Sequence, residues 1–208
     1  NGLYHGGSGI RITGFENLIF EFCSFTSNTA YEQKSQSRPK MPSDPDYYNG
    51  DGGALQLGYD EATNVNLSMH NCTFTGNRAA RNGGALAIQT TGAVEIIGCT
   101  FTQNGFLTSS KLLYDNNYNK AYPGSRGGAI YINPTYSYKN NDGIIDFTMT
   151  SLRIEECTFT DNTAYDGFAI YVEGEPSTTT FEIINNKFDN NNATTTEPDS
   201  KRAQFTTE

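Results

Sequence analysis

Hydrophobic and polar residues alternate over short segments of the chain, and turn-forming residues separate these segments. Such alternation is typical of β-strands, whose successive side chains point to opposite faces. No stretch shows the spacing of an amphipathic helix long enough to connect two parallel strands, which excludes a βαβ layout. One set of predicted strands recurs at 18–22, 65–69, 94–97, 152–154 and 181–184. The pattern therefore predicts an all-β protein with internal repeats.

Two sequence motifs alternate along the chain. The first, Cys-Thr-Phe-Thr-x-Asn, follows each of these predicted strands: it occurs at 72–77, 99–104 and 157–162, with Ser in place of the first Thr at 23–28 and a degenerate copy at 186–191. The second, Gly-Gly-Ala-aliphatic-x-aliphatic, occurs at 52–57, 83–88 and 127–132, with variants at 167–172 and 7–12. One such unit cannot close a core alone, whereas stacked units share one.

We therefore predict a right-handed parallel β-helix of about five coils, each with three short strands, as a single domain over residues 1–192. The stretches 29–51, 105–126 and 133–146 lengthen the repeat. We expect them to be long corner loops, because solenoids tolerate insertions at their corners. Residues 193–208 are expected to form a polar C-terminal tail or an inter-subunit segment.

Charge and hydropathy exclude several classes of protein. The net charge of −9 over 208 residues argues against binding to nucleic acid or to anionic membranes. No apolar run approaches the roughly 20 residues of a transmembrane helix. The start of the sequence lacks an initiator Met and the basic and apolar regions of a signal peptide, as expected of a processed product or of a piece of a longer chain.

The first motif predicts a core ladder, because alternation directs its Cys and Phe inward and both Thr outward. The ladder consists of Cys23, Cys72, Cys99, Cys157, Phe25, Phe74, Phe101, Phe159 and Phe188. We expect the cysteines to be buried free thiols, with a disulfide between ladder neighbours as the alternative. No metal site is expected, since there is no Cys-x-x-Cys and only His5 and His70 are available.

The last residue of the motif predicts a ladder of asparagines. It consists of Asn28, Asn77, Asn104, Asn162 and Asn191. Asn tolerates left-handed turns, and stacked side-chain amides can hydrogen-bond from rung to rung. We expect a structural rather than a catalytic role for these residues.

Other polar residues have a functional and a plain interpretation. Asn66, Asn71 and Asn192 lie in N-glycosylation sequons, although three sequons are no more than chance provides in so Asn-rich a chain. The outward pairs of the first motif (Ser24/Thr26, Thr73/Thr75, Thr100/Thr102, Thr158/Thr160) resemble an ice-binding face, but Thr also simply favours exposed strand positions. The oxygen-rich segment with Asp44, Asp46, Asn49 and Asp51 lacks calcium-loop spacing, so a solvated loop is the preferred interpretation.

The paired motifs resemble the repeats of the polymorphic outer membrane protein family, surface adhesins of the pectin-lyase-like β-helix superfamily. Similar repeats occur in large surface proteins of some protists. The motif residues are Gly52 to Leu55, Gly83 to Leu86 and Gly127 to Ile130, alternating with Phe25–Asn28, Phe74–Asn77, Phe101–Asn104, Phe159–Asn162 and Phe188–Asn191. The resemblance implies a right-handed β-helix with surface display and adhesion.

Two classes of function remain open. The leading hypothesis is a non-catalytic extracellular or cell-surface module of an adhesin, stalk or filament, without catalytic residues or cofactors, that self-associates or continues into further repeats and binds a glycan or host-surface ligand. The alternative is a polysaccharide lyase or glycoside hydrolase, which needs an acidic cluster, often with Arg or Lys, on adjacent rungs. Glu95, Asp146, Glu155, Glu156, Asp161 and Asp166 fall at different coil positions and predict no such cluster.

Overall fold

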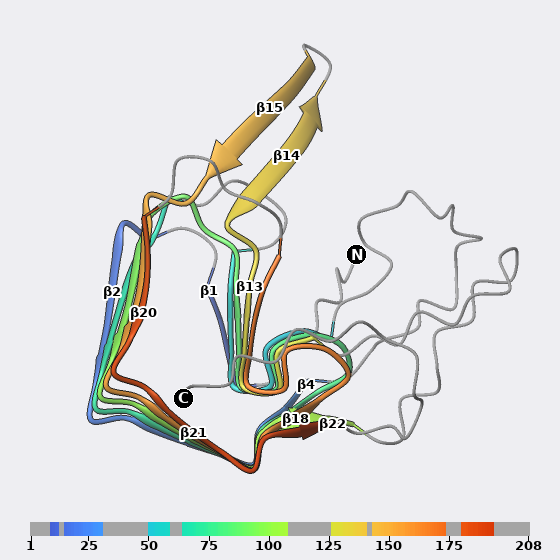
Figure 1. Ribbon diagram of the computed structural model, residues 1–208. Coiled ribbons are helices and arrows are strands. Elements are labelled where there is room, and N and C mark those ends of the chain that lie inside the picture. Colours follow the sequence, from blue (N-terminus) through green and yellow to red (C-terminus); the bar gives the residue numbers. More distant parts are fainter. Residues whose placement is uncertain are drawn as a thin grey trace, which may run out of the picture.

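The computed structural model describes residues 9–12, 15–30, 50–58, 64–107, 126–140, 143–173 and 180–193, and the side chains of 136–147 are not among the described features. Over these residues all the regular elements are strands, and they form three stacked five-stranded parallel sheets (Figure 1). The prediction of a parallel β-helix with about five coils is confirmed.

Each coil contributes one short strand to each sheet, and neighbouring coils pair in register. Sheet A contains β1 (Ile10–Ile12), β5 (Leu55–Leu57), β9 (Leu86–Ile88), β13 (Ile130–Ile132) and β19 (Ile170–Val172). Sheet B contains β2 (Asn17–Glu21), β6 (Asn66–His70), β10 (Ala93–Ile97), β16 (Ser151–Glu155) and β20 (Thr180–Ile184). Sheet C contains β3 (Ser24–Thr26), β7 (Thr73–Thr75), β11 (Thr100–Thr102), β17 (Thr158–Thr160) and β21 (Lys187–Asp189).

The coil also contains a fourth, two-residue strand, which the motifs did not predict. These strands are β4 (Thr29–Ala30), β8 (Arg78–Ala79), β12 (Gly105–Phe106), β18 (Thr163–Ala164) and β22 (Asn192–Ala193). They pair in parallel as β12-β8-β4 and β18-β22. A strand of two residues is too short to show a recognisable alternation in the sequence. Its backbone groups must still hydrogen-bond to a neighbouring coil.

The fourth strand corrects the predicted insertion boundaries. The predicted insertions 29–51 and 105–126 begin with residues of β4 and β12, so both depart from the coil later than expected. The last residue of each insertion also belongs to the coil: Asp51 is buried, and Arg126 forms a parallel bridge with Asp166. The insertion at 133–146 is an antiparallel hairpin of β14 (Thr135–Asn140) and β15 (Gly143–Thr148), which projects from the coil in Figure 1. Ala193, assigned to the tail, belongs to β22.

The corners on both sides of sheet C contain a residue in the left-handed conformation. The position before each core-ladder Cys or its Asn186 equivalent has positive φ, at Phe22, Asn71, Gly98, Glu156 and Asn185. The position before each ladder Asn does too, at Ser27, Gly76, Gln103, Asp161 and Asn190. The expectation that the ladder asparagines themselves occupy left-handed turns is therefore wrong: the preceding residue makes the bend, which leaves the Asn side chain free to point along the stack.

Candidate functional site

The first motif lies in the interior, where its Phe rings form one continuous stack. The centroids of Phe25, Phe74, Phe101, Phe159 and Phe188 follow one another at 4.8, 4.8, 4.9 and 5.0 Å. The three middle rings are 0% exposed, and the two outer rings are partly buried. This spacing is the ordinary distance between paired strands, so the backbone register imposes the stack.

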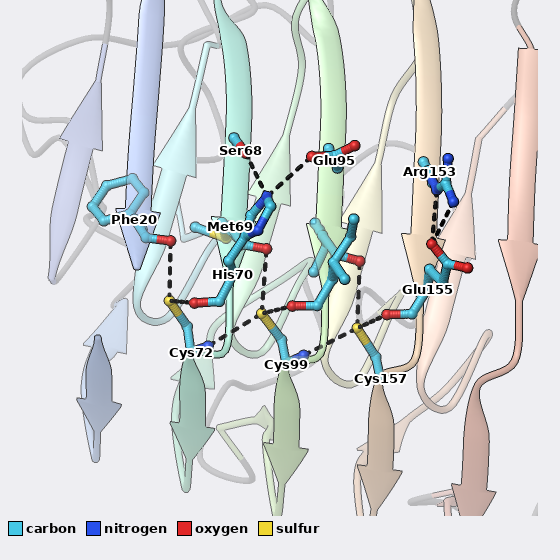
Figure 2. A network of polar contacts seen from close by, with 12 residues as sticks. Phe20, Ser68, Met69, His70, Cys72, Glu95, Cys99, Arg153, Glu155 and Cys157 are labelled. Atoms are coloured by element: carbon cyan, nitrogen blue, oxygen red, sulfur yellow. Dashed lines mark hydrogen bonds and ion pairs between the residues drawn. The ribbon is translucent and has the colours of Figure 1, made fainter. Parts of the chain in front are cut away.

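Cys72, Cys99 and Cys157 form a row along successive coils (Figure 2) and belong to the same core cluster as the Phe stack. The backbone N–H of Cys72 donates to Sγ of Cys99, and that of Cys99 donates to Sγ of Cys157, both over 3.4 Å. The row ends at Asn186, whose Oδ1 accepts the N–H of Cys157 at 2.8 Å, so the degenerate copy keeps the acceptor. Cys72, Cys99 and Cys157 are buried, Cys23 is partly buried, and all four are free thiols.

Burial and the hydrogen bonds between neighbours shift the pKa of the buried thiols in different directions. It raises the pKa of Cys72 to about 11. The hydrogen bond to the neighbouring Cys157 and burial together raise the pKa of Cys99. The hydrogen bond with Cys99 lowers the pKa of Cys157 against the effect of its burial. Because the thiolate is the reactive form, Cys72 and Cys99 are poor nucleophiles.

We expect one fast-reacting thiol in the native protein. At mildly alkaline pH a small aromatic disulfide reagent should modify Cys23 rapidly and should modify Cys72, Cys99 and Cys157 only as fast as the coils open, because those three are buried. The same titration after denaturation without reductant is the control and should reveal all four thiols. Rapid modification of Cys99 in the folded state, or fewer thiols after denaturation, would contradict this assignment.

The Asn ladder is an unbroken chain of amide hydrogen bonds. Nδ2 of Asn28 donates to Oδ1 of Asn77 at 2.9 Å, and the pattern continues through Asn104 and Asn162 to Asn191 at 2.9, 3.1 and 2.9 Å. Each Oδ1 that accepts this bond also accepts the backbone N–H of the preceding ladder Asn. Asn77, Asn104 and Asn162 are 0% exposed, so this satisfied network holds the corner and offers nothing to a substrate.

The outer face of sheet B carries a polar row that contains a histidine. Ser68 Oγ and Glu95 Oε1 lie 2.8 and 3.0 Å from the same atom, Nε2 of His70 (Figure 2). A Ser-His-acid relay needs the serine and the acid on different ring nitrogens. Since both partners compete for one nitrogen, these three residues do not form a catalytic triad.

The same face contains an ion-pair group that the motif analysis missed. Glu95, Arg153 and Glu182 occupy one row on successive coils. Arg153 donates to Glu155 Oε2 from Nε at 2.9 Å and from Nη2 at 2.5 Å, and its Nη1 lies 3.8 Å from Glu182. Glu95 and Glu155 do fall in different rows, as expected, but the row of Glu95 holds an Arg and a second acid on the next two coils. The expectation that no acids and Arg would align on adjacent rungs is therefore wrong, because Arg153 and Glu182 are not repeated residues and their alignment appears only in the register of the coils.

A second polar cluster lies beside sheet A, and we call its members Gln56, Arg126, Tyr131, Tyr171 and Glu173 the sheet A cluster. Glu173 accepts from Arg126 Nη1 at 2.6 Å and from the Tyr131 hydroxyl. The Arg126 guanidinium lies 5.1 Å from the centre of the Tyr171 ring. Burial, reinforced by the hydrogen bond to Glu173, raises the pKa of Tyr131. The Gln56 amide is buried and has no hydrogen-bond partner among the residues that the structure describes.

Asp51 lies close enough to the sheet A cluster to influence it electrostatically. It is 1% exposed, its Oδ1 accepts the N–H of Asn82 at 2.8 Å, and Arg81 Nη1 lies 4.0 Å from its Oδ2. Burial raises the pKa of Asp51, although Arg81 and the Asn82 N–H oppose the shift. The expectation of a solvated Asp51 is thus wrong, because this residue caps the buried corner before Gly52. Asp44, Asp46 and Asn49 lie outside the described residues.

The sequence contained a signal for the corner that holds Asp51 and Arg126. Asp51, Asn82, Arg126 and Asp166 all stand immediately before the first residue of the second motif, so their side chains belong to one corner. Because they differ in residue type, a search for repeated residues passes over them.

The sequon asparagines are placed at the surface or engaged in local bonds. Asn71 is exposed in a left-handed corner. Asn66 is exposed, and its side chain donates to Asn17 Oδ1 at 3.0 Å and accepts from the N–H of Ala93 at 2.9 Å. Nδ2 of Asn192 donates to the carbonyl of Asn190 at 2.6 Å. Of the three, Asn71 has the side-chain amide least engaged in hydrogen bonds to other described residues.

Within the described ranges, no group of three or more His, Cys, Asp or Glu is arranged to hold a metal ion. Over the same residues there is no helix that could cross a membrane. His5 lies outside them.

The family comparison agrees with this architecture. Residues 1–205 match the family described as "right handed beta helix region". Comparison with the curated proteins and with the solved structures finds no match. With nearly the whole sequence matched and the parallel sheets stacked in register, the chain belongs to the right-handed β-helix family.

Proposed function

We propose that this chain is a non-catalytic structural or adhesive module of an extracellular or cell-surface protein. The observation that carries the proposal is the use of the repeated residues. The motif Cys and Phe line the core, the ladder Asn hydrogen-bond to one another, and the paired Gly form the tight corner before sheet A. A repeat so fully committed to the fold is typical of a scaffold, whose function lies in its length and in its exposed faces.

The exposed ionisable groups on sheet B support the same proposal. His70 hydrogen-bonds to Glu95, and Arg153 pairs with Glu155 and Glu182, so these ionisable groups are engaged with one another. The resemblance of the two motifs to surface adhesins supports display outside the cell. A glycan or another surface component is the kind of ligand that such a face would bind. Antibody labelling of intact cells of the source organism tests this location, and labelling that requires permeabilisation would contradict it.

A second candidate function, a polysaccharide lyase or glycoside hydrolase, is favoured by the sheet A cluster. Glu173, Arg126 and Tyr131 combine a carboxylate, a guanidinium and a phenol, groups that can bind an acidic sugar and move a proton. The arrangement also fits a structural clamp, since the carboxylate already has both partners.

We expect no catalysis on acidic polysaccharides. Incubation with pectic and uronic-acid polymers, with and without calcium, should yield neither new reducing ends nor unsaturated products. If products form, Glu173→Gln separates the sites: loss of activity in that variant, with activity retained in Glu182→Gln, would overturn the non-catalytic proposal and locate the reaction at the sheet A cluster. Glu182 is a matched control because its side chain is also partly exposed and also pairs with an arginine.

A further inference from the structure

Exposed apolar side chains gather at the two ends of the stack. Among the described residues, the large hydrophobic side chains that are exposed are Phe15, Ile19 and Phe22 in the first coil and Ile183 and Ile184 in the last. The middle coils expose none of this kind within the same ranges. An apolar surface confined to the ends indicates a surface that association would bury.

The inward-facing side chains are likewise more exposed in the end coils than in the middle coils. Ile183 occupies the row of Met69, Ile96 and Ile154 in sheet B, which are each 0% exposed, yet it is 41% exposed itself. Phe25 and Phe188 are only partly buried at the two ends of a stack whose middle rings are fully buried. Each end coil thus presents half of a core.

The Asn ladder gives the two ends different chemistry. From Asn28 to Asn162, each ladder Asn donates its Nδ2 and its backbone N–H to Oδ1 of the ladder Asn on the next coil. Among the described residues, Asn28 Oδ1 at the first coil therefore has no donor, and the Asn191 backbone N–H at the last coil has no acceptor. A first coil placed on a last coil satisfies both groups, whereas two first coils would bring acceptor against acceptor.

We propose that copies of this chain associate head to tail, with the first coil of one copy stacked on the last coil of another in ladder register. Phe25 then stacks on Phe188 of the neighbouring copy, and Asn191 donates to Asn28 across the joint. The sheets of the two copies become continuous through their edge strands, which pair readily with a complementary strand. Such a contact is heterologous, so it propagates into a filament.

The outward residues are compatible with this register. Continuing the rows of sheets B and C across the joint pairs Glu182 with Ile19, Ile184 with Glu21, Lys187 with Ser24 and Asp189 with Thr26. No pair brings like charges together. Rows that continue in register without a like-charge pair favour a second copy over an unrelated partner.

A charge added at one row tests the joint. Ser24 faces Thr73 within its own chain and has Thr26 two residues along its strand, so Ser24→Lys creates no internal like-charge pair, but it opposes Lys187 of the neighbouring copy. Sedimentation velocity from low micromolar to near-millimolar concentration should show wild-type oligomers. Ser24→Lys should weaken the association about tenfold or more. Adding Lys187→Gln to that variant should restore it. Thr73→Lys, an exposed outward site on the second coil, is the matched control and should leave association unchanged.

Different results would overturn the association and its register. A wild-type chain that stays monomeric over the whole range, with the backbone amides of its end coils protected from exchange, overturns the proposal because the chain then covers its own ends. Equal effects of Ser24→Lys and Thr73→Lys, or no rescue by Lys187→Gln, overturn the register. The inference rests on the structural part of the proposed function, but it fails separately: polysaccharide cleavage would refute the non-catalytic role and leave the association untouched.

Discussion

Replacing Gly84 with valine is expected to abolish the native fold. Gly84 does not have positive φ; the constraint is the close approach of neighbouring coils. A Cβ built there overlaps the carbonyl oxygen of Gly128 on the next coil and the backbone of Gly105 in β12. Backbone atoms cannot move aside without breaking the coil register. We therefore expect a loss of more than about 4 kcal/mol in the free energy of unfolding, seen as lost soluble yield and a collapsed thermal transition.

The matched control is Gly76→Asn. Gly76 does have positive φ, but a Cβ there meets only Ser27 Oγ at 3.7 Å. Equivalent corners carry Ser27, Gln103, Asp161 and Asn190, so this position accepts a side chain. Thermal unfolding of Gly76→Asn should resemble that of the wild type. Wild-type unfolding of Gly84→Val would show that the coils do not approach one another there.

Phe101→Ala is expected to destabilise the protein by about 3–5 kcal/mol, because it opens a cavity that rigid neighbours cannot fill. The ring is 0% exposed and lies between Phe74 and Phe159 at 4.8 and 4.9 Å. Both neighbours are held at the spacing of the coils, so collapse onto the cavity is restricted. The free energy of unfolding, from denaturant titration, measures the effect.

Phe15→Ala provides the comparison. Phe15 is 63% exposed, and its truncation should cost less than about 0.5 kcal/mol when measured at a concentration too low for association. A loss below about 1 kcal/mol for Phe101→Ala would contradict its place in the core stack.

The β-helix and its core could be predicted because every coil repeats the same alternation of inward and outward residues. Cys99 and Phe101 alternate with Thr100 and Thr102, and this period alone directs Cys and Phe inward and Thr outward. Because the motif recurs along the chain, the coils are expected to stack, and stacking places equivalent motif residues next to one another on neighbouring coils. The amide bonds from Asn77 to Asn104 follow directly from that alignment.

The clusters of unlike residues could not be predicted in the same way. Arg126 and Glu173 are not repeated, and they meet only because the corner before β13 and the end of β19 lie beside the same sheet. His70 and Glu95 likewise became neighbours through the register of β6 and β10. A motif search finds what recurs, whereas a polar contact between coils depends on which different residues share a row.

The sequence by itself determined the coil, the inward residues and the ladders, because these depend on local alternation and on repetition. Only the tertiary structure decided which corner residue bends the chain, where the coil resumes after each insertion and how the two ends differ. Asn28 and Asn191 carry the same side chain in the same motif, yet among the described residues Asn28 Oδ1 lacks a donor and the Asn191 backbone N–H lacks an acceptor. That difference arises because a hydrogen-bonded stack has a direction, which appears only when its coils are placed one upon another.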